Sequence, residues 1–486
     1  MALRCELATI EVGQSDRERE SHKRPIREGQ STEVEEAVAD RPVVAEKPGN
    51  AGGAKGTGHP GLVGGQLPGQ EEPTSRPKPF AISKQIVWEA YRRVKANKGA
   101  AGVDGESIVE FERDLEGNLY KLWNRMSSGS YFPPPVRAVE IPKKSGSGVR
   151  VLGVPTVADR IAQTVAAMYL EPNVEPIFHD DSYGYRPRRS AIQAVERCRE
   201  RCWRTDWVID LDIKAFYDTI PHHLIVKAVA KHTQLKWLLL YVKRWLEAPL
   251  QREDGTLVAR DRGSPQGSAI SPLLANLFLH YCFDSWMERT FPSIRFERYC
   301  DDIVVHCVSE AQAEYVKDQI GRRLKECGLE LSSEKTRIVY CKDEKRTGSH
   351  PCEKFEFLSY EFRARRVRTR DGRYFDGFNP AISPEELQRL RDEIRGWKLA
   401  RWTSKSLAEL AKWVNPRVQG WLNYYGSFFK SAMHSLFWML DQHLAGWARR
   451  KYKRLHRSWS QAFWFLRRVS RQAPGLFAHW RWGLRS

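Results

Sequence analysis

The sequence predicts a mixed α/β region followed by a smaller, basic α-helical domain, and three observations lead to this prediction. Between residues 80 and 362, helical patterns alternate with short runs rich in β-branched residues, which is typical of an α/β fold. Beyond residue 380, apolar residues recur at helical spacing. The net charge of +19 is concentrated in residues 363–486, which carry 26 Lys and Arg against 8 Asp and Glu, with 10 of the 17 Trp residues.

The N-terminal segment, residues 1–75, is dominated by charged and small residues, as in "AEKPGNAGGAKGTGHPGLVGGQ". This composition buries too little apolar surface to offset the entropy of ordering, so we predict a disordered segment. Order should begin near Phe80, because Ile86, Ala90 and Val94 follow at helical spacing. The chain has no apolar run of membrane length and no signal-peptide layout, which predicts a soluble intracellular protein without a membrane partner.

The nine cysteines include one pair with the spacing of a helical turn, Cys198 and Cys202. No second Cys/His pair lies near them in the sequence to complete a zinc site. We therefore expect reduced, structural thiols.

The tail, residues 383–454, contains three helical patterns. The segment from Ser383 to Glu386 has the form of a capping box with Pro384 at the first helical position, and Ser406 with Glu409 repeats the box. A third pattern ends in a cationic cluster of Arg449, Arg450, Lys451, Lys453 and Arg454. Basic residues interleaved with aromatic ones suit folded RNA or single strands. The alternative is a solvated basic face over an aromatic core.

Adjacent carboxylates in "RYCDDIVVHC" stand out, because Asp301 and Asp302 precede a β-branched run that favours a buried strand. Desolvating two neighbouring carboxylates costs several kcal/mol unless a cation or donor compensates, so a divalent metal is one explanation and a solvated turn the other. In "WVIDLDIKAFYD", Asp210 and Asp212 share one face of a predicted strand and offer a third carboxylate. Such a set suits two Mg²⁺ ions that activate a 3′-hydroxyl and stabilise leaving pyrophosphate.

Several motifs, taken in their order along the chain, resemble those of a known protein family. The segments "DIKAFYDTIPH", "RGSPQGSAISPLLANLFLH", "RYCDDIVVHC", "LSSEKTRI" and "FEFLSYEF" resemble successive palm motifs of reverse transcriptases. Upstream are "NKGAAGVDG", "EIPKKSGSGVRVLGVPTVADRIAQ" and "DSYGYRPRRSA", and downstream are "NPRVQGWLNYYGSFFKSA" and "RRKYKRL". From about residue 80 to 482, the chain is similar to the group II intron reverse transcriptase and maturase family of the bacterial type.

The resemblance implies a right-hand polymerase fold, with fingers in residues 76–206, palm in 207–362 and an α-helical thumb or maturase domain in 363–486. It implies an RNA-directed DNA polymerase that binds a group II intron RNA, assists its splicing and copies it into cDNA. Its partners would be the intron RNA, an RNA template, a DNA primer or target, and deoxynucleotides, and the resemblance implies a cytoplasmic location in a bacterium. The HNH endonuclease of many relatives is expected to be absent. The alternatives are an RNA-binding splicing cofactor without polymerase activity and a defence-associated reverse transcriptase.

The resemblance also assigns the metal-binding aspartates as Asp212, Asp301 and Asp302. Asp210 is the less suitable first carboxylate, because the family motif reads Asp-(Ile/Leu)-Lys and matches Asp212. The chain departs from the family at Cys300, where alanine is usual; both residues are small, so we expect activity to survive.

Nucleotide-binding roles follow from the same motifs. Lys143 and Arg150, which flank "KSGSG", would clamp the triphosphate, and the ring of Tyr217 would exclude the 2′-hydroxyl of the sugar. The loop that contains Gln266 and Gly267 would let the backbone approach the nucleotide. Lys335 would neutralise charge on the pyrophosphate. The alternatives are a solvated hairpin for the clamp, core packing for Tyr217, an ordinary loop-to-helix turn, and a surface lysine.

Overall fold

The structure is a computed structural model that describes residues 78–142, 149–368 and 371–482. The segment predicted to be disordered, residues 1–75, lies outside these residues, and so does Lys143.

The N-terminal part of the described chain is mainly helical. Its elements are α1 (Lys84–Ala96), α2 (Ile108–Phe111), η1 (Glu112–Asp114), α3 (Leu115–Ser128), α4 (Val157–Val174), η2 (Glu175–Ile177) and α5 (Ala191–Cys202). Helix α1 forms because its apolar residues recur on one face, where Ala90 and Val94 are buried as the pattern predicted and Ile86 is partly buried. Helix α5 begins with a capping box between Ser190 and Gln193, which satisfies two backbone donors of its first turn.

The structure also contains a small four-stranded sheet with the strand order β2-β1-β4-β5. Strand β1 (Val136–Pro142) pairs antiparallel with β2 (Val149–Val154) and parallel with β4 (Leu250–Gln251). Strand β5 (Leu257–Val258) completes the sheet at its edge.

A second sheet, with the order β6-β7-β3-β8, lies at the centre of the chain, and all its strand pairs are antiparallel. Its strands are β3 (Trp207–Asp212), β6 (Arg295–Tyr299), β7 (Asp302–Cys307) and β8 (Arg337–Tyr340). Side chains alternate between its faces, because successive residues of a strand point in opposite directions. Ile209 and Ile303 belong to one hydrophobic core and Val208 and Val304 to another, so this sheet separates two cores.

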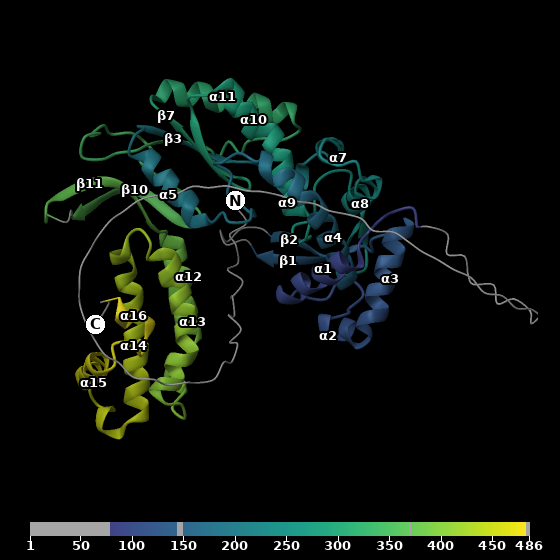
Figure 1. Ribbon diagram of the computed structural model, residues 1–486. Helices are drawn as coiled ribbons and strands as arrows, with labels where there is room; N and C mark the ends of the chain where they lie inside the picture. The colour runs from purple at the N-terminus through teal and green to yellow at the C-terminus, as the bar shows by residue number, and fades with distance from the viewer. Residues whose placement is uncertain (1–77, 143–148, 369–370, 483–486) are drawn as a thin grey trace, which may run out of the picture. The chain divides into compact units, whose positions relative to one another are not determined.

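Several helices share the core that contains Ile209 and Ile303. They are α6 (Phe216–Thr219), α7 (His222–Ala230), α8 (Lys236–Glu247), α9 (Ser271–Leu279), the π-helical turn η3 (His280–Asp284), α10 (Ser285–Thr290) and α11 (Glu310–Glu326). Helix α11 contacts β3, β7 and β8, and Figure 1 shows it beside β3 and β7. Its apolar residues Val316, Ile320 and Leu324 join the core that contains Ile209 and Ile303.

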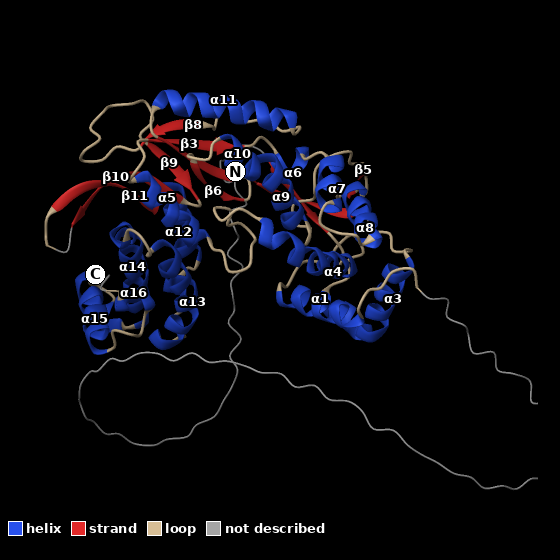
Figure 2. Ribbon diagram, turned by 45° about the horizontal axis from the view of Figure 1, so that its top comes forward, coloured by secondary structure: helices blue, strands red, loops and turns tan. Residues whose placement is uncertain are grey.

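Two long strands that follow the central sheet in the chain, β10 and β11, form a two-stranded ribbon (Figure 2). Strand β10 (Tyr360–Arg368) pairs antiparallel with β11 (Tyr374–Ile382) along its whole length and with β9 (Lys354–Phe357) at its start. The boundary predicted between residues 362 and 363 falls inside β10.

The C-terminal part is helical, as predicted. Its elements are α12 (Pro384–Gly396), η4 (Leu399–Arg401), α13 (Leu407–Tyr425), η5 (Lys430–Met433), α14 (His434–Lys451), η6 (Lys453–Leu455), α15 (Trp459–Gln472) and α16 (Ala478–Arg481). The capping box at Ser406 and Glu409 is confirmed. At Ser383 only half of the predicted box forms, because the Glu386 side chain binds Arg389 and Tyr425 instead of the backbone of Ser383.

The tail helices share the second core with the central sheet. Phe437, Leu440 and Trp447 of α14 are fully buried there. Trp421 and Tyr425 of α13 are buried as well, with 6% and 3% of their surface exposed, so both are core residues rather than stacking platforms.

All eight cysteines that the structure describes are free thiols, as expected. The fold brings Cys341 and His306, which are distant from Cys202 in the sequence, close to its thiol.

Candidate active site

Two strands of the central sheet bring the three predicted aspartates to one end. Asp212 is the last residue of β3 and lies directly opposite Asp302, the first residue of β7. Asp301 occupies the two-residue turn between β6 and β7, in which Tyr299 pairs with Asp302. Cys300, the first residue of this turn, has φ of +59°. A positive φ at the first turn position matches the right-handed twist of a tight hairpin, so the turn projects Asp301 beside the strand ends.

A buried arginine, Arg298, holds this turn in position by hydrogen bonds. Arg298 is fully buried, and its guanidinium donates to both carboxylate oxygens of Asp284 at 2.7 Å. The same guanidinium donates to Asn276 Oδ1 at 2.9 Å and to the Cys300 carbonyl at 3.1 Å. The position of the turn is therefore tied to α9 and η3, and sequence reasoning did not find this residue.

Gly184 of "DSYGYRP" provides room for the turn. A Cβ atom at this position would lie 2.5 Å from Cys300 Sγ and 2.7 Å from Cys300 N. A side chain at residue 184 would consequently push the turn that carries Asp301 out of place.

The electrostatics of the aspartates favour a bound cation. Asp301 is buried, and its Oδ1 has no hydrogen-bond partner among the described residues. Burial raises the pKa of the Asp301 carboxyl. Burial, together with repulsion from Asp210 and Asp301, raises the pKa of Asp302 well above its ordinary value. A divalent cation would compensate both costs, so these residues fit a metal site.

Asp210, the alternative first carboxylate, is placed differently. It lies two residues before Asp212 on the same strand face, opposite Arg337 of β8 and Val304 of β7. Burial raises its pKa to about 7, while Arg337 acts in the opposite direction. Asp210 is thus further inside the sheet than the strand-end pair of Asp212 and Asp302.

Two of the predicted nucleotide-binding cations lie near the aspartates. Lys335 Nζ is 3.7 Å from Asp212 Oδ2, and half of the lysine side chain is exposed. Arg150 of β2 is close enough to Asp301 for its charge to lower the pKa of that carboxyl, against the larger effect of burial. Lys143, the other expected clamp residue, lies outside the described residues.

The remaining predicted nucleotide-binding residues are Tyr217, which lies near Asp301, and Gln266 and Gly267, which contact Gly153 of β2, the strand that carries Arg150. Tyr217 of α6 is buried, its ring packs edge-on against Phe216 at 5.2 Å, and its hydroxyl has no hydrogen-bond partner among the described residues. The Gln266 carbonyl accepts from Gly153 N at 2.7 Å. Gly267 has φ of +112°, and a Cβ there would lie 2.7 Å from the Gly153 carbonyl, so this close approach requires glycine.

A second hairpin contacts Asp302, and its role was not apparent from the sequence. Leu358 and Ser359 join β9 to β10, with φ of +52° and +66°. The Leu358 backbone N–H donates to the Asp302 carboxylate, and this bond acts to lower the pKa that burial raises. On the other side, Tyr424 Oη of α13 donates to the Leu358 carbonyl at 2.9 Å. The helical tail is therefore linked to Asp302 through one backbone turn.

The predicted RNA-binding cations divide into two groups. Arg449 and Lys451 are tied to the chain, since Arg449 donates to the His456 carbonyl at 2.9 Å and Lys451 to the Thr403 carbonyl at 2.9 Å. The exposed members of the cluster are Arg450, Lys453 and Arg454.

Exposed tryptophans lie on the helix that follows these cations in the chain, α15. Trp459 and Trp464 of α15 are 50% and 64% exposed, which is unusual for a large aromatic side chain. Arg449 lies 4.3 Å from the ring centroid of Trp459, and Arg468 lies 5.4 Å from that of Trp464. Such pairs of ring and guanidinium are suited to stacked bases and phosphates.

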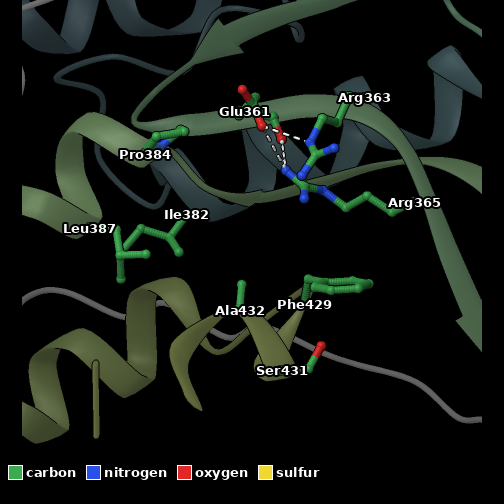
Figure 3. Close-up of a pocket in the computed structure, with 9 residues that line it drawn as sticks. All are labelled: Glu361, Arg363, Arg365, Ile382, Pro384, Leu387, Phe429, Ser431 and Ala432. Atoms are coloured by element: carbon green, nitrogen blue, oxygen red, sulfur yellow. Dashed lines mark hydrogen bonds and ion pairs between the residues drawn. The ribbon is translucent and has the colours of Figure 1, made fainter. Parts of the chain in front are cut away.

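A basic pocket lies between the ribbon and the tail, lined by residues of β10, β11, α12 and η5 and by Phe429 (Figure 3). Glu361 binds two of its arginines, Arg363 at 2.8 Å and Arg365 at 3.2 Å. The Arg365 guanidinium also lies 5.6 Å from the ring centroid of Phe429. One carboxylate faces two guanidinium groups, so the pocket keeps a positive charge.

No helix in the described part of the chain is long and apolar enough to cross a membrane.

Comparison with known proteins distinguishes two parts of the chain. Residues 141–362 match the family described as reverse transcriptase (RNA-dependent DNA polymerase), and residues 387–466 match the family described as group II intron, maturase-specific domain.

Two relatives illustrate the match. Protein YkfC of Escherichia coli (strain K12) is 32% identical over 301 residues, which cover 53% of this chain and 78% of YkfC. The group II intron-encoded protein LtrA of Lactococcus lactis subsp. cremoris is 27% identical over 322 residues, which cover 65% of this chain and 50% of LtrA. The matched region thus spans half the length of LtrA.

Proposed function

The chain belongs to the group II intron reverse transcriptase and maturase family, and from this we propose that it is an RNA-directed DNA polymerase that binds a group II intron RNA, assists its splicing and copies it into cDNA. The mixed α/β fold with a helical tail agrees with a reverse transcriptase domain followed by a maturase domain. The observation that carries the proposal is the meeting of Asp212, Asp301 and Asp302 at one end of the central sheet.

Reverse transcriptases as a class use divalent metal ions. We propose that Asp212, Asp301 and Asp302 hold two Mg²⁺ ions, since Mg²⁺ prefers a few carboxylates together with substrate phosphates. When bound, such ions activate the attacking 3′-hydroxyl and stabilise the leaving pyrophosphate. The unpartnered Oδ1 of Asp301 supports this role, because a buried carboxylate oxygen needs a compensating group.

The other residues of the site would bind the deoxynucleotide. Arg150, beside Asp301, would contact the triphosphate together with Lys143. Lys335, beside Asp212, would neutralise charge on the leaving pyrophosphate. Gln266 and Gly267 would approach the nucleotide through their backbone, and the Tyr217 ring would restrict the space at the sugar.

The tail would bind RNA by shape and charge. The exposed cations Arg450, Lys453 and Arg454 would contact phosphates, and Trp459 and Trp464 would stack on unpaired bases. Arg363 and Arg365 of the basic pocket would extend this surface along the ribbon.

Asp302→Asn tests the proposal, because it keeps the shape of the side chain and removes its charge. Primer extension on an RNA template and splicing of the intron RNA should be measured on one preparation. We expect DNA synthesis to be almost abolished while RNA binding and splicing persist, because in this family the intron RNA supplies its own catalytic metals. Near-normal DNA synthesis would refute the metal assignment. Lost splicing in a folded variant would refute the division of roles between sheet and tail.

A further inference from the structure

A buried glutamine of α4 is hydrogen-bonded to the loop that contains Gln266 and Gly267. Gln163 is 1% exposed, and its Oε1 accepts from the Ser268 hydroxyl and from the Ala269 backbone N–H, both at 2.7 Å. Along the loop, Ser268 is buried, whereas Gly267 and Ala269 on either side of it are exposed. Gln163 therefore holds the loop from the protein side and leaves its outer side accessible.

The two partners of the Gln163 amide allow only one orientation of it. The Ala269 N–H can only donate, so it requires the amide oxygen. On the opposite side, Gln163 Nε2 donates to Asp159 Oδ2 at 2.9 Å. Burial raises the pKa of Asp159 to about 6, so above that pH the group is a carboxylate that can only accept. A flipped amide would present the wrong group to both partners.

The carboxylate that orients this amide is itself anchored. Asp159 is 1% exposed, and its Oδ1 accepts from Tyr131 Oη and from Trp245 Nε1, both at 2.7 Å. Its backbone N–H donates to Thr156 Oγ1 at 3.1 Å, a bond that caps the first turn of α4. Hydrogen bonds to an ionised acceptor are stronger than neutral ones, so this network fixes Gln163 against rotation.

The loop is held at a second point by β2, the strand that carries Arg150. Gly153 N donates to the Gln266 carbonyl at 2.7 Å, and Gly267 approaches the Gly153 carbonyl so closely that a Cβ atom would lie 2.7 Å from it. Strand β2 is followed in the chain by α4, the helix of Gln163. Gly153 and Gln163 thus tie the loop to one continuous unit of strand and helix.

We propose that Gln163 is a positioning residue for deoxynucleotide binding. It holds the backbone of Gln266 and Gly267 in a fixed position relative to Arg150, so that loop and strand contact one deoxynucleotide together. The inference rests on the proposed function, in which these three residues bind the incoming deoxynucleotide. A loop without this tie has to be ordered at each binding event, and that ordering reduces affinity. Loss of the amide should therefore weaken deoxynucleotide binding and leave the chemical step almost unchanged.

The competing explanation is that the buried network only stabilises the core. Two variants separate the explanations. Gln163→Met keeps the approximate shape of the side chain and removes both hydrogen bonds to the loop, together with one donor to Asp159. Tyr131→Phe is the matched control, because it also removes one donor to Asp159 and leaves the loop contacts intact. Both variants leave Asp159 one donor short, and only Gln163→Met changes the loop.

The first test is hydrogen exchange of the Ala269 amide in the full chain, which requires no polymerase activity. We expect exchange about tenfold faster in Gln163→Met than in the wild type, because the acceptor of this N–H is lost. Exchange in Tyr131→Phe should match the wild type. Unchanged exchange in Gln163→Met would overturn the proposal, because the glutamine would then not hold the loop.

The second test is single-turnover primer extension with varied deoxynucleotide concentration. In Gln163→Met the apparent Kd for deoxynucleotide should rise about tenfold, with the maximal rate within about twofold of the wild type, and Tyr131→Phe should change neither. A slower maximal rate with unchanged Kd, or an equal rise in Kd in both variants, would overturn the positioning role. A wild type that does not extend primers would instead refute the proposed function.

A third variant keeps the proposal testable if Gln163→Met does not fold. Ser268→Ala removes one of the two hydrogen bonds from the loop side and leaves the contact between Gln163 and Asp159 intact. It should raise the apparent Kd for deoxynucleotide about threefold at an unchanged maximal rate, since half of the tie remains. An active Ser268→Ala protein with wild-type Kd would overturn the proposal.

Discussion

Tyr424→Phe tests whether the helical tail positions Asp302, which we propose to be a metal ligand. The substitution removes only the hydroxyl, which donates to the Leu358 carbonyl at 2.9 Å. Leu358 N–H in turn donates to the Asp302 carboxylate. Leu358 and Ser359 both have positive φ, which costs a residue with a Cβ on the order of 1–2 kcal/mol. The turn therefore depends on bonds from outside, among them the one from Tyr424.

The expected magnitude follows from this single bond. A neutral hydrogen bond contributes about 1 kcal/mol to stability, so the free energy of unfolding should fall by about that amount. If all of this energy served to hold Leu358 against Asp302, the rate of nucleotide addition would fall about fivefold, since about 1.4 kcal/mol corresponds to a factor of ten. Deoxynucleotide affinity should change little, because Tyr424 is not among the residues proposed to bind it.

The assay is single-turnover primer extension, which separates the rate of nucleotide addition from deoxynucleotide affinity, repeated over a Mg²⁺ titration. Tyr425→Phe is the matched control, because its hydroxyl lies in the same aromatic cluster and donates to Glu386 Oε1 at 2.9 Å. We expect a slower rate and a higher Mg²⁺ requirement in Tyr424→Phe alone. If both variants behaved alike, the hydroxyl would have only a packing role and the positioning argument would be refuted.

Three further changes test other parts of the site. Arg298→Met should lower the free energy of unfolding in urea by about 3–5 kcal/mol, because it leaves the buried Asp284 carboxylate unpaired. Adding Asp284→Leu should restore much of this stability. If the destabilising effects of the two substitutions simply added, the ion-pair argument would be contradicted. Tyr217→Phe should leave the free energy of unfolding unchanged or slightly higher, because the hydroxyl that it removes has no hydrogen-bond partner among the described residues. The variant should also keep sugar discrimination in primer extension. Relaxed discrimination would show that the hydroxyl itself takes part in sugar selection. The double variant Arg450→Gln with Lys453→Gln should flatten the slope of log affinity for single-stranded RNA against log salt concentration. The slope should change by about 0.7 for each phosphate that the variant no longer neutralises. An unchanged slope would mean that both residues belong to a solvated face that does not contact RNA.

The sequence allowed the palm aspartates to be placed for local reasons. β-branched residues after Asp302 and before Asp212 predict buried strands, and alternation then decides which side chains share a face. The order of the motifs along the chain then indicated which aspartates to assign as metal ligands. Burial of Trp421 and Tyr425 was also predictable, because aromatic residues at helical spacing usually pack in a core.

Contacts between distant segments could not be predicted in the same way. Tyr424 and Leu358 are separated by 66 positions, and nothing in either local pattern indicates that they meet. Cys341 and His306 reach Cys202 only because β7 and β8 flank β3 in the sheet. Strand order and register bring them together, and these are properties of the whole sheet. The half-formed cap at Ser383 has a similar origin, since tertiary contacts to Glu386 replaced a local bond.

Register links the buried cluster of His306, Glu297 and Cys202 to the candidate active site. Asp302, Val304 and His306 lie on one face of β7, with Asp302 opposite Asp212 and His306 opposite Val208. A slip by one residue would turn every side chain of β7 to the other face, so Asp302 and His306 would leave their sites together. His306 is held by Glu297 of β6 and contacts Cys202 of α5, and these bonds exist only in the native register. The buried cluster at one end of β7 therefore stabilises the pairing that places Asp302 opposite Asp212 at the other.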